Sequence, residues 1–160
     1  MSMNKTQRCQ AAMDYRRQGL NCSQCLLAAF ADAAGLTLEQ AMALGAGMGG
    51  GVRCGSICGA VSAPVMLLGT ACPDPTDRPA VTAVVKEYQR RFLEHFHRMD
   101  CRELLRAQDL EPSGAVQGRF TAAAPTFLQH EVAVCRSADA CRAGDHVHGV
   151  IIVHLTEVVN

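Results

Sequence analysis

The sequence predicts an all-α protein, a single-domain helical bundle with a glycine-rich turn between two of its helices. Its 160 residues suit one domain with a hydrophobic core of its own. Aromatic residues make up only 4% of the chain and tryptophan is absent, while alanine, leucine, methionine and glycine abound. This composition favours close-packed helices over a β-sandwich, which needs more β-branched and aromatic side chains. Apolar residues also recur at helical spacing along much of the chain.

Two helices are predicted before residue 36. The first spans about 5–18, and Gly19 ends it. The second has the sequence CSQCLLAAFADAAG, with Asn21 as its N-cap and Gly35 at its end. Its apolar residues recur at helical spacing, so one face of this helix is expected to be buried.

A third helix is predicted to begin after Thr37, which is a good N-cap. This helix ends in the run GAGMGGGVRCG, the clearest departure from regular structure in the chain. Glycine adopts positive φ angles without strain and lets two backbones come close together. The run therefore predicts a turn that lies close to a neighbouring segment.

The segment after the glycine run, SICGAVSAPVMLLGTAC, predicts a buried helix with Cys58 at or just before its start. Pro64 is expected in the first turn or at a kink, because proline disrupts a helix interior. A longer helix is expected from about residue 80, and Asp100 is positioned to cap a short helix with Cys101 in its first turn. The apolar stripe of the long helix is Val81, Val84, Val85, Tyr88, Phe92 and Phe96.

The C-terminal part of the chain gives weaker signals. Residues 109–130 are predicted as a loop-rich insertion, and the segments 126–142 and 146–159 are expected to be helical. Together with an N-terminal helical segment, 1–18, these parts are expected to form one four-cysteine redox or metal-binding domain over residues 1–160.

Charge and hydropathy exclude several classes of function. Fifteen basic residues balance fifteen acidic ones, and no long basic run occurs, so nucleic acid is not an expected partner. No apolar run is long enough to span a membrane, and the N-terminus has no apolar signal region. The sequence therefore predicts a cytoplasmic protein that does not bind membranes.

Nine cysteines are the strongest clue to chemistry: Cys9, Cys22, Cys25, Cys54, Cys58, Cys72, Cys101, Cys135 and Cys141. In a reducing cytosol, many cysteines indicate metal ligation or redox chemistry more often than structural disulfides. A tetrahedral zinc site and an iron–sulfur cluster each need about four thiolates, which this chain offers from well-separated segments. The spacing matches no local ferredoxin or zinc-ribbon pattern, so spacing alone does not identify the metal.

Two cysteine pairs allow different interpretations. Cys22 and Cys25 share a helix face and form either a redox pair or, for Cys25, part of the apolar core. Cys22 lies at a helix start, where the helix dipole favours a thiolate. Cys54 and Cys58 flank a short glycine-containing turn and are read as ligands, as a redox pair or as part of a tight turn. The glycines free backbone N–H groups to face an anionic sulfur.

The segments NCSQCLLAAFADAAGL, CGAVSA and CRELL, with the glycine run between them, resemble the C_GCAxxG_C_C family of redox-active proteins. The resemblance covers about residues 15–108. This family is similar in turn to the cluster-bearing part of split-Soret cytochromes. The resemblance therefore implies four cysteines around an iron–sulfur centre in a mostly helical fold. The chain departs from the pattern at Ala63, where the family motif has a glycine.

By position, the resemblance implies four metal ligands: Cys22, Cys58, Cys101 and Cys141, with Cys135 as the alternative for the fourth. Neighbouring groups expected at the cofactor are Gly49, Gly50, Gly51, Gly59 and Cys54. The implied function is that of an electron carrier or redox sensor rather than an enzyme that transforms a metabolite, since no substrate motif is present.

Two alternatives remain open on the sequence. One is a thiol–disulfide oxidoreductase that uses Cys54 with Cys58 or Cys22 with Cys25, and the other is a structural zinc protein. The partner is expected to be another redox protein, and a homodimer is compatible with a small helical chain.

Overall fold

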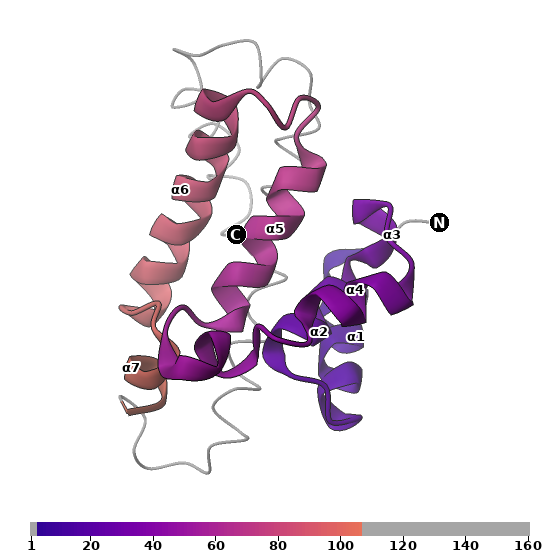
Figure 1. Cartoon of the computed structure of the whole chain (residues 1–160), viewed down its shortest axis with the longest axis vertical. Helices are drawn as coiled ribbons and strands as arrows, with labels where there is room; N and C mark the ends of the chain where they lie inside the picture. The colour runs from indigo at the N-terminus through magenta and orange to yellow at the C-terminus, as the bar shows by residue number, and fades with distance from the viewer. Residues whose placement is uncertain (1–2, 107–160) are drawn as a thin grey trace.

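A computed structural model describes residues 3–106, and all elements in it are helical (Figure 1). In chain order they are α1 (Lys5–Arg17), α2 (Cys22–Ala29), α3 (Ala31–Ala34), α4 (Leu38–Gly45), the single turn η1 (Gly51–Gly55), α5 (Gly59–Ala71), α6 (Arg78–Phe96) and α7 (Cys101–Arg106). The all-α prediction is confirmed. The predicted insertion at 109–130 and the two C-terminal helices lie outside the described residues.

The helices form two groups that lie side by side, with α2 and α3 of one group packed against α5 of the other (Figure 1). Helices α5 and α6 pack together as an antiparallel pair, and α1, α2 and α4 pack beside one another. Helix α2 joins the groups because it contacts α1, α4 and α5. The short α7 lies against η1. In the part of the chain that the structure describes, no helix is long and apolar enough to cross a membrane.

Capping boxes fix the starts of α1, α2 and α4. The side chains of Asn4, Asn21 and Thr37 each accept a hydrogen bond from the backbone N–H three residues later, and the side-chain oxygen of a glutamine at that position accepts one from the backbone N–H of the cap residue. This reciprocal pairing satisfies two backbone N–H groups that a helix start otherwise leaves open. The starts predicted at Asn21 and Thr37 are therefore confirmed.

The second predicted helix is broken at Phe30, where φ is −117° and ψ is 10°. The break coincides with a long-range contact from α1. The buried Arg8 side chain donates to the Ala29 carbonyl at 2.6 Å and pairs with Asp32, and its guanidinium lies 4.5 Å from the centre of the Phe30 ring. Because Arg8 takes the Ala29 carbonyl, α2 ends there and α3 begins two residues later, at Ala31.

Pro64 lies inside α5, beyond the first turn, which was one of the two positions expected for it. A helical proline cannot donate to the carbonyl four residues earlier, which here belongs to Ala60. The buried Tyr88 hydroxyl of α6 donates to that carbonyl instead, at 2.7 Å. Burial holds the pKa of Tyr88 well above its usual value, so the hydroxyl stays a donor. Tyr88 therefore replaces the hydrogen bond that Pro64 removes.

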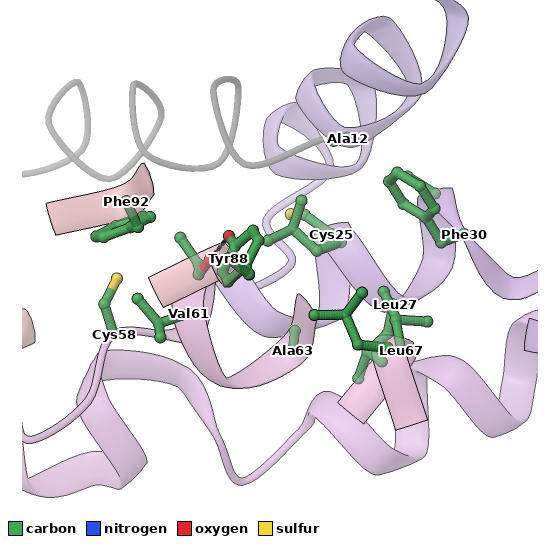
Figure 2. Close-up of a cluster of buried hydrophobic side chains, with 14 of the residues drawn as sticks. Ala12, Cys25, Leu27, Phe30, Cys58, Val61, Ala63, Leu67, Tyr88 and Phe92 are labelled. Carbon is green, nitrogen blue, oxygen red and sulfur yellow. Dashed lines mark hydrogen bonds between the residues drawn. The ribbon is translucent and has the colours of Figure 1, made fainter. Parts of the chain in front are cut away.

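The core fills the space between α2, α5 and α6 (Figure 2). The predicted stripe of α6 faces it: Val84, Tyr88 and Phe92 are buried, and the other predicted positions are partly buried against it. Figure 2 shows Cys58 at one edge of this cluster, beside Val61. The end of the bundle where Cys58 lies is thus anchored by large apolar side chains.

Candidate metal and redox centre

A single pair of backbone hydrogen bonds brings Cys58 and Cys101 together. Ile57 and Asp100 form an isolated antiparallel bridge. The Cys58 N–H donates to the Met99 carbonyl at 2.8 Å, and the Cys101 N–H donates to the Ser56 carbonyl at 2.7 Å. Each cysteine directly follows a bridge residue and stands at the start of a helix, so the bridge fixes the two side chains as neighbours.

Cys22 joins them from the first residue of α2 and is 3% exposed. The backbone N–H groups of Gly50, Gly59 and Ser23 each lower the pKa of Cys22 and so favour its thiolate form. Two of these donors come from predicted cofactor-site glycines on different segments, one before η1 and one at the start of α5. N–H groups aimed at a sulfur are what an anionic thiolate or a cluster requires.

The three thiols interact electrostatically, with Cys58 between the other two. The hydrogen bond with the Cys58 thiol, aided by the surrounding N–H groups, lowers the pKa of Cys22 from 9.0 to about 6 against the opposing effect of burial. A hydrogen bond with Cys58 also lowers the pKa of Cys101. Contacts with Cys101 and Cys22, together with burial, raise the pKa of Cys58. The Cys58 thiol, whose pKa is raised, therefore lies between two sulfurs whose pKa values its hydrogen bonds lower.

Gly59 lets the starts of α2 and α5 approach each other. A Cβ at Gly59 would overlap the Cys22 sulfur and the Ser23 hydroxyl, and it would lie 2.9 Å from the Ser23 nitrogen. Gly51 plays a similar part for the third thiol, because a Cβ there would lie 2.8 Å from the Cys101 Cβ and would overlap the Ser56 carbonyl oxygen. Both glycines are therefore required by close packing around the thiols.

The backbone between α4 and α5 passes through a left-handed turn. Gly50, Gly51, Val52 and Arg53 have φ angles of 64°, 63°, 55° and 60°. Glycine adopts this region freely, but a left-handed conformation costs other residues about 1–2 kcal/mol each, and a β-branched residue such as valine is rarely found there. Strained backbone of this kind persists only where the surroundings hold it, and it concentrates at functional sites.

Asn21 connects α2 to this turn. Its side-chain oxygen caps α2, and its Nδ2 donates to the carbonyls of Gly45 and Ala46 at 3.0 and 3.2 Å. Gly49 packs against the same side chain, since a Cβ there would lie 2.7 Å from the Asn21 Cβ. The sequence predicted the cap, but the amide contacts to the end of α4 depend on the tertiary fold and had no sequence signal.

Two cysteines near the site have other roles. Cys54 is exposed, its thiol donates to the Gly51 carbonyl at 3.3 Å, and its own carbonyl accepts a hydrogen bond from Arg102 at 2.8 Å. Cys25 is fully buried, and burial raises its pKa to about 11. The core interpretation of Cys25 therefore agrees with its position, while Cys54 lies on the exposed turn η1, which packs against α7.

The donors brought together are three buried thiols from three segments. Within residues 3–106, no three or more His, Cys, Asp or Glu side chains are grouped closely enough to hold a metal ion. Cys22, Cys58 and Cys101 thus offer the soft sulfur chemistry that a thiophilic metal prefers, but within the described residues they are not at metal-ligating spacing. Cys135 and Cys141, the candidates for a fourth ligand, lie outside the described residues.

The chain was compared with known proteins at three levels. A family model described as "Putative redox-active protein (C_GCAxxG_C_C)" matches residues 20–139, well over half of the chain. The match includes Cys135 and ends before Cys141. The comparison with curated proteins and the comparison with solved structures gave no significant match.

Proposed function

The chain belongs to the C_GCAxxG_C_C family of redox-active proteins, and from this membership we propose that it carries an iron–sulfur cluster and acts as an electron carrier or redox sensor. Cys22, Cys58 and Cys101 would be three of its ligands. Cys135 or Cys141 would be the fourth, and the extent of the family match favours Cys135 over Cys141. Such a cluster supplies a reversible one-electron centre.

The observation that carries the proposal is the convergence of three thiols that are distant in sequence. They stand at the starts of α2, α5 and α7, and each is no more than 3% exposed. Buried free thiols often serve only as small apolar core residues. The N–H groups around the Cys22 sulfur and the glycines that admit it support a role as an anionic ligand.

Different residues of the chain would contribute to metal binding in different ways. The lowered pKa of Cys22 favours its thiolate form, whereas the raised pKa of Cys58 favours the thiol, whose proton would have to leave when a metal binds. The backbone bridge at Ile57 and Asp100 would hold two ligands at a fixed separation. Metal uptake is therefore expected to release protons and to be weaker at low pH.

Anaerobic purification, followed by visible absorption and by iron and sulfide analysis, tests the proposal directly. We expect a coloured protein that contains iron and acid-labile sulfide, or one that takes up both on reconstitution. Cys22→Ala, Cys58→Ala and Cys101→Ala should each lose the iron. Cys25→Ala is the matched control, because this buried thiol is only three residues from Cys22, and it should retain the iron.

The fourth ligand is tested in the same way. Cys135→Ala should lose the iron, while Cys141→Ala should retain it; the reverse result would assign Cys141. A colourless wild-type protein without iron after anaerobic reconstitution would overturn the cluster proposal, and stoichiometric zinc in its place would favour the structural zinc alternative.

A specific observation supports a second candidate, a thiol–disulfide oxidoreductase. Cys22 is a low-pKa thiol in hydrogen-bonding contact with the protonated thiol of Cys58, a combination typical of reactive dithiols. The Cys22 thiolate would attack a substrate disulfide and release one substrate sulfur as a thiolate; the Cys58 sulfur would then displace the second substrate sulfur, forming the Cys22–Cys58 bond, and the single proton of the pair would pass to one of the two sulfurs released. This pairing differs from Cys54 with Cys58 and from Cys22 with Cys25, the two expected from the sequence.

Mass spectrometry after mild oxidation with a small disulfide tests this second candidate. A reversible Cys22–Cys58 disulfide in metal-free protein, together with no iron in the protein as purified, would favour the oxidoreductase. Failure to form any reversible intramolecular disulfide would exclude it.

A further inference from the structure

The Cys58 thiol contacts two other thiols, and each contact has its own structural cause. Cys22 lies beside Cys58 because Gly59 lets the starts of α2 and α5 come close, so that a Cβ at Gly59 would overlap the Cys22 sulfur. Cys101 lies beside Cys58 because the isolated backbone bridge directly precedes both residues. The N–H groups of Cys58 and Cys101 both donate across this bridge, at 2.8 and 2.7 Å. Helix packing thus fixes one contact, and backbone hydrogen bonds fix the other.

The three sulfurs form a row in which Cys58 is the middle member. Hydrogen bonds link the Cys58 thiol to Cys22 and to Cys101. Cys22 and Cys101 act on each other only through charge, and no hydrogen bond joins these two described residues. Within residues 3–106 the three thiols do not close into a group that could hold a metal ion. The contacts are therefore pairwise, and the Cys58 sulfur has two possible partners for a disulfide.

A sulfur with one thiol on each side is the arrangement that thiol–disulfide exchange requires. In this reaction a thiolate attacks one sulfur of a disulfide and displaces the other. The attacking sulfur approaches the central sulfur from the side opposite to the departing one, so a row of three sulfurs meets the requirement. The two outer thiols also come from different helices: Cys22 from α2, which packs on α5, and Cys101 from α7, which packs on η1.

We infer that Cys101 is a third redox thiol, which exchanges the disulfide of Cys58 between Cys22 and itself; this inference rests on the oxidoreductase candidate above. The Cys101 thiolate attacks the Cys58 sulfur of a Cys22–Cys58 disulfide. The Cys58–Cys101 bond forms, the Cys22–Cys58 bond breaks, and Cys22 leaves as a thiolate. One thiolate is consumed and one is released, so the step needs no oxidant, reductant or proton. The backbone N–H groups that favour the Cys22 thiolate make it a good leaving group.

The exchange would move a covalent link from one interface to another. A Cys22–Cys58 disulfide would tie the start of α2 to α5, whereas a Cys58–Cys101 disulfide would tie the start of α7 to α5. Cys101 has exposed neighbours, because Arg102 follows it in the chain and Ser56 accepts a hydrogen bond from its N–H. The disulfide would therefore move away from the buried start of α2 and toward the exposed turn η1.

Disulfide mapping by mass spectrometry tests this inference in the metal-free, full-length protein after mild oxidation with a small disulfide. The wild type should contain both Cys22–Cys58 and Cys58–Cys101, and no Cys22–Cys101. Cys101→Ala should form only the first of these bonds, Cys22→Ala only the second, and Cys58→Ala neither. Cys25→Ala is the matched control and should form both, because the Cys25 thiol donates instead to the Leu20 carbonyl at 3.6 Å.

The exchange step itself can be followed in the wild type. Protein with the Cys22–Cys58 bond, isolated in acid where thiolates are protonated, should convert to a mixture with Cys58–Cys101 at mildly alkaline pH. The rate should not depend on protein concentration, because the step is intramolecular. A bond that never converts, a concentration-dependent rate, or a Cys22–Cys101 disulfide would overturn the inference and leave the oxidoreductase candidate standing. Wild-type protein that forms no reversible disulfide among these thiols would overturn that candidate itself.

Discussion

Replacing Gly59 by alanine should damage both the fold and the thiol centre, whereas the same replacement at Gly69 of the same helix should stabilise the protein. The new methyl at residue 59 would overlap the Cys22 sulfur and the Ser23 hydroxyl. It would also meet the Ser23 backbone nitrogen at 2.9 Å, and backbone cannot rotate out of the way as a side chain can. A Cβ at Gly69 would have no neighbour within 4 Å.

The two substitutions should change the free energy of unfolding in opposite directions. Overpacking at Gly59 should cost about 1–3 kcal/mol, since α2 and α5 must move apart to admit the methyl group. Gly69→Ala should gain about 0.5–1 kcal/mol, because alanine has the higher helix propensity and loses less backbone entropy on folding. The pair should therefore be separated by about 1.5–4 kcal/mol in the free energy of unfolding.

Equilibrium urea denaturation of the metal-free protein under anaerobic conditions measures both values, and the slope of the transition shows whether the unfolded state has changed. Iron retention after reconstitution gives a second readout, which should fall in Gly59→Ala and stay unchanged in Gly69→Ala. The reasoning would be refuted by a Gly59→Ala protein as stable as the wild type, or by equal effects of the two substitutions.

Three further predictions concern a buried hydroxyl, a titrating thiol and a cap. Tyr88→Phe should lower the free energy of unfolding, measured by urea denaturation, by about 1–3 kcal/mol, because it leaves a buried carbonyl without a donor. The loss should be smaller in a Pro64→Ala background, where alanine restores the helical N–H. Equal losses in the two backgrounds would contradict this account. In metal-free protein the pKa of Cys22, near 6, lies below its usual value of 9.0, so the folded state favours the Cys22 thiolate. The thiolate therefore contributes its full stabilisation of the fold above pH 9, and this stabilisation is lost as the pH falls through 6. Cys22→Ala should therefore flatten the rise of stability between these pH values and remove a thiolate ultraviolet transition near pH 6, and a transition that persists in the variant would assign it to another group. Asn21→Ala should cost about 1–2 kcal/mol through loss of the α2 cap and should also lower iron retention, whereas Thr37→Ala, which removes the equivalent cap of α4, should lower stability alone.

Local rules were enough to predict much of the helical framework. Asn21 and Thr37 were identifiable as N-caps because capping depends on residues three apart. The stripe on α6 was identifiable because burial follows the helical period. Cys58 and Cys101 were correctly expected at or next to helix starts.

What the sequence could not show depends on contacts between distant segments. The end of α2 at Ala29 is set by Arg8, which lies 21 residues earlier. Pro64 is tolerated inside α5 because Tyr88 donates to the carbonyl that proline leaves open. Neither partner has a local pattern that identifies its target. The meeting of Cys58 and Cys101 likewise depends on one bridge between residues 57 and 100, too short to leave a strand signal.

The reversal of helical hand after α4 has a consequence for individual hydrogen-bonding groups. Had the right-handed helix continued through Gly50, the Gly50 N–H would have bonded the Ala46 carbonyl, and both groups would have been used up within the helix. The mirror-image turn separates them. The N–H becomes available to the Cys22 sulfur, and the carbonyl accepts instead from Asn21 and from Arg53 at 2.9 Å. One change of hand thus releases a donor for the thiolate and an acceptor for the residues that hold the turn in place.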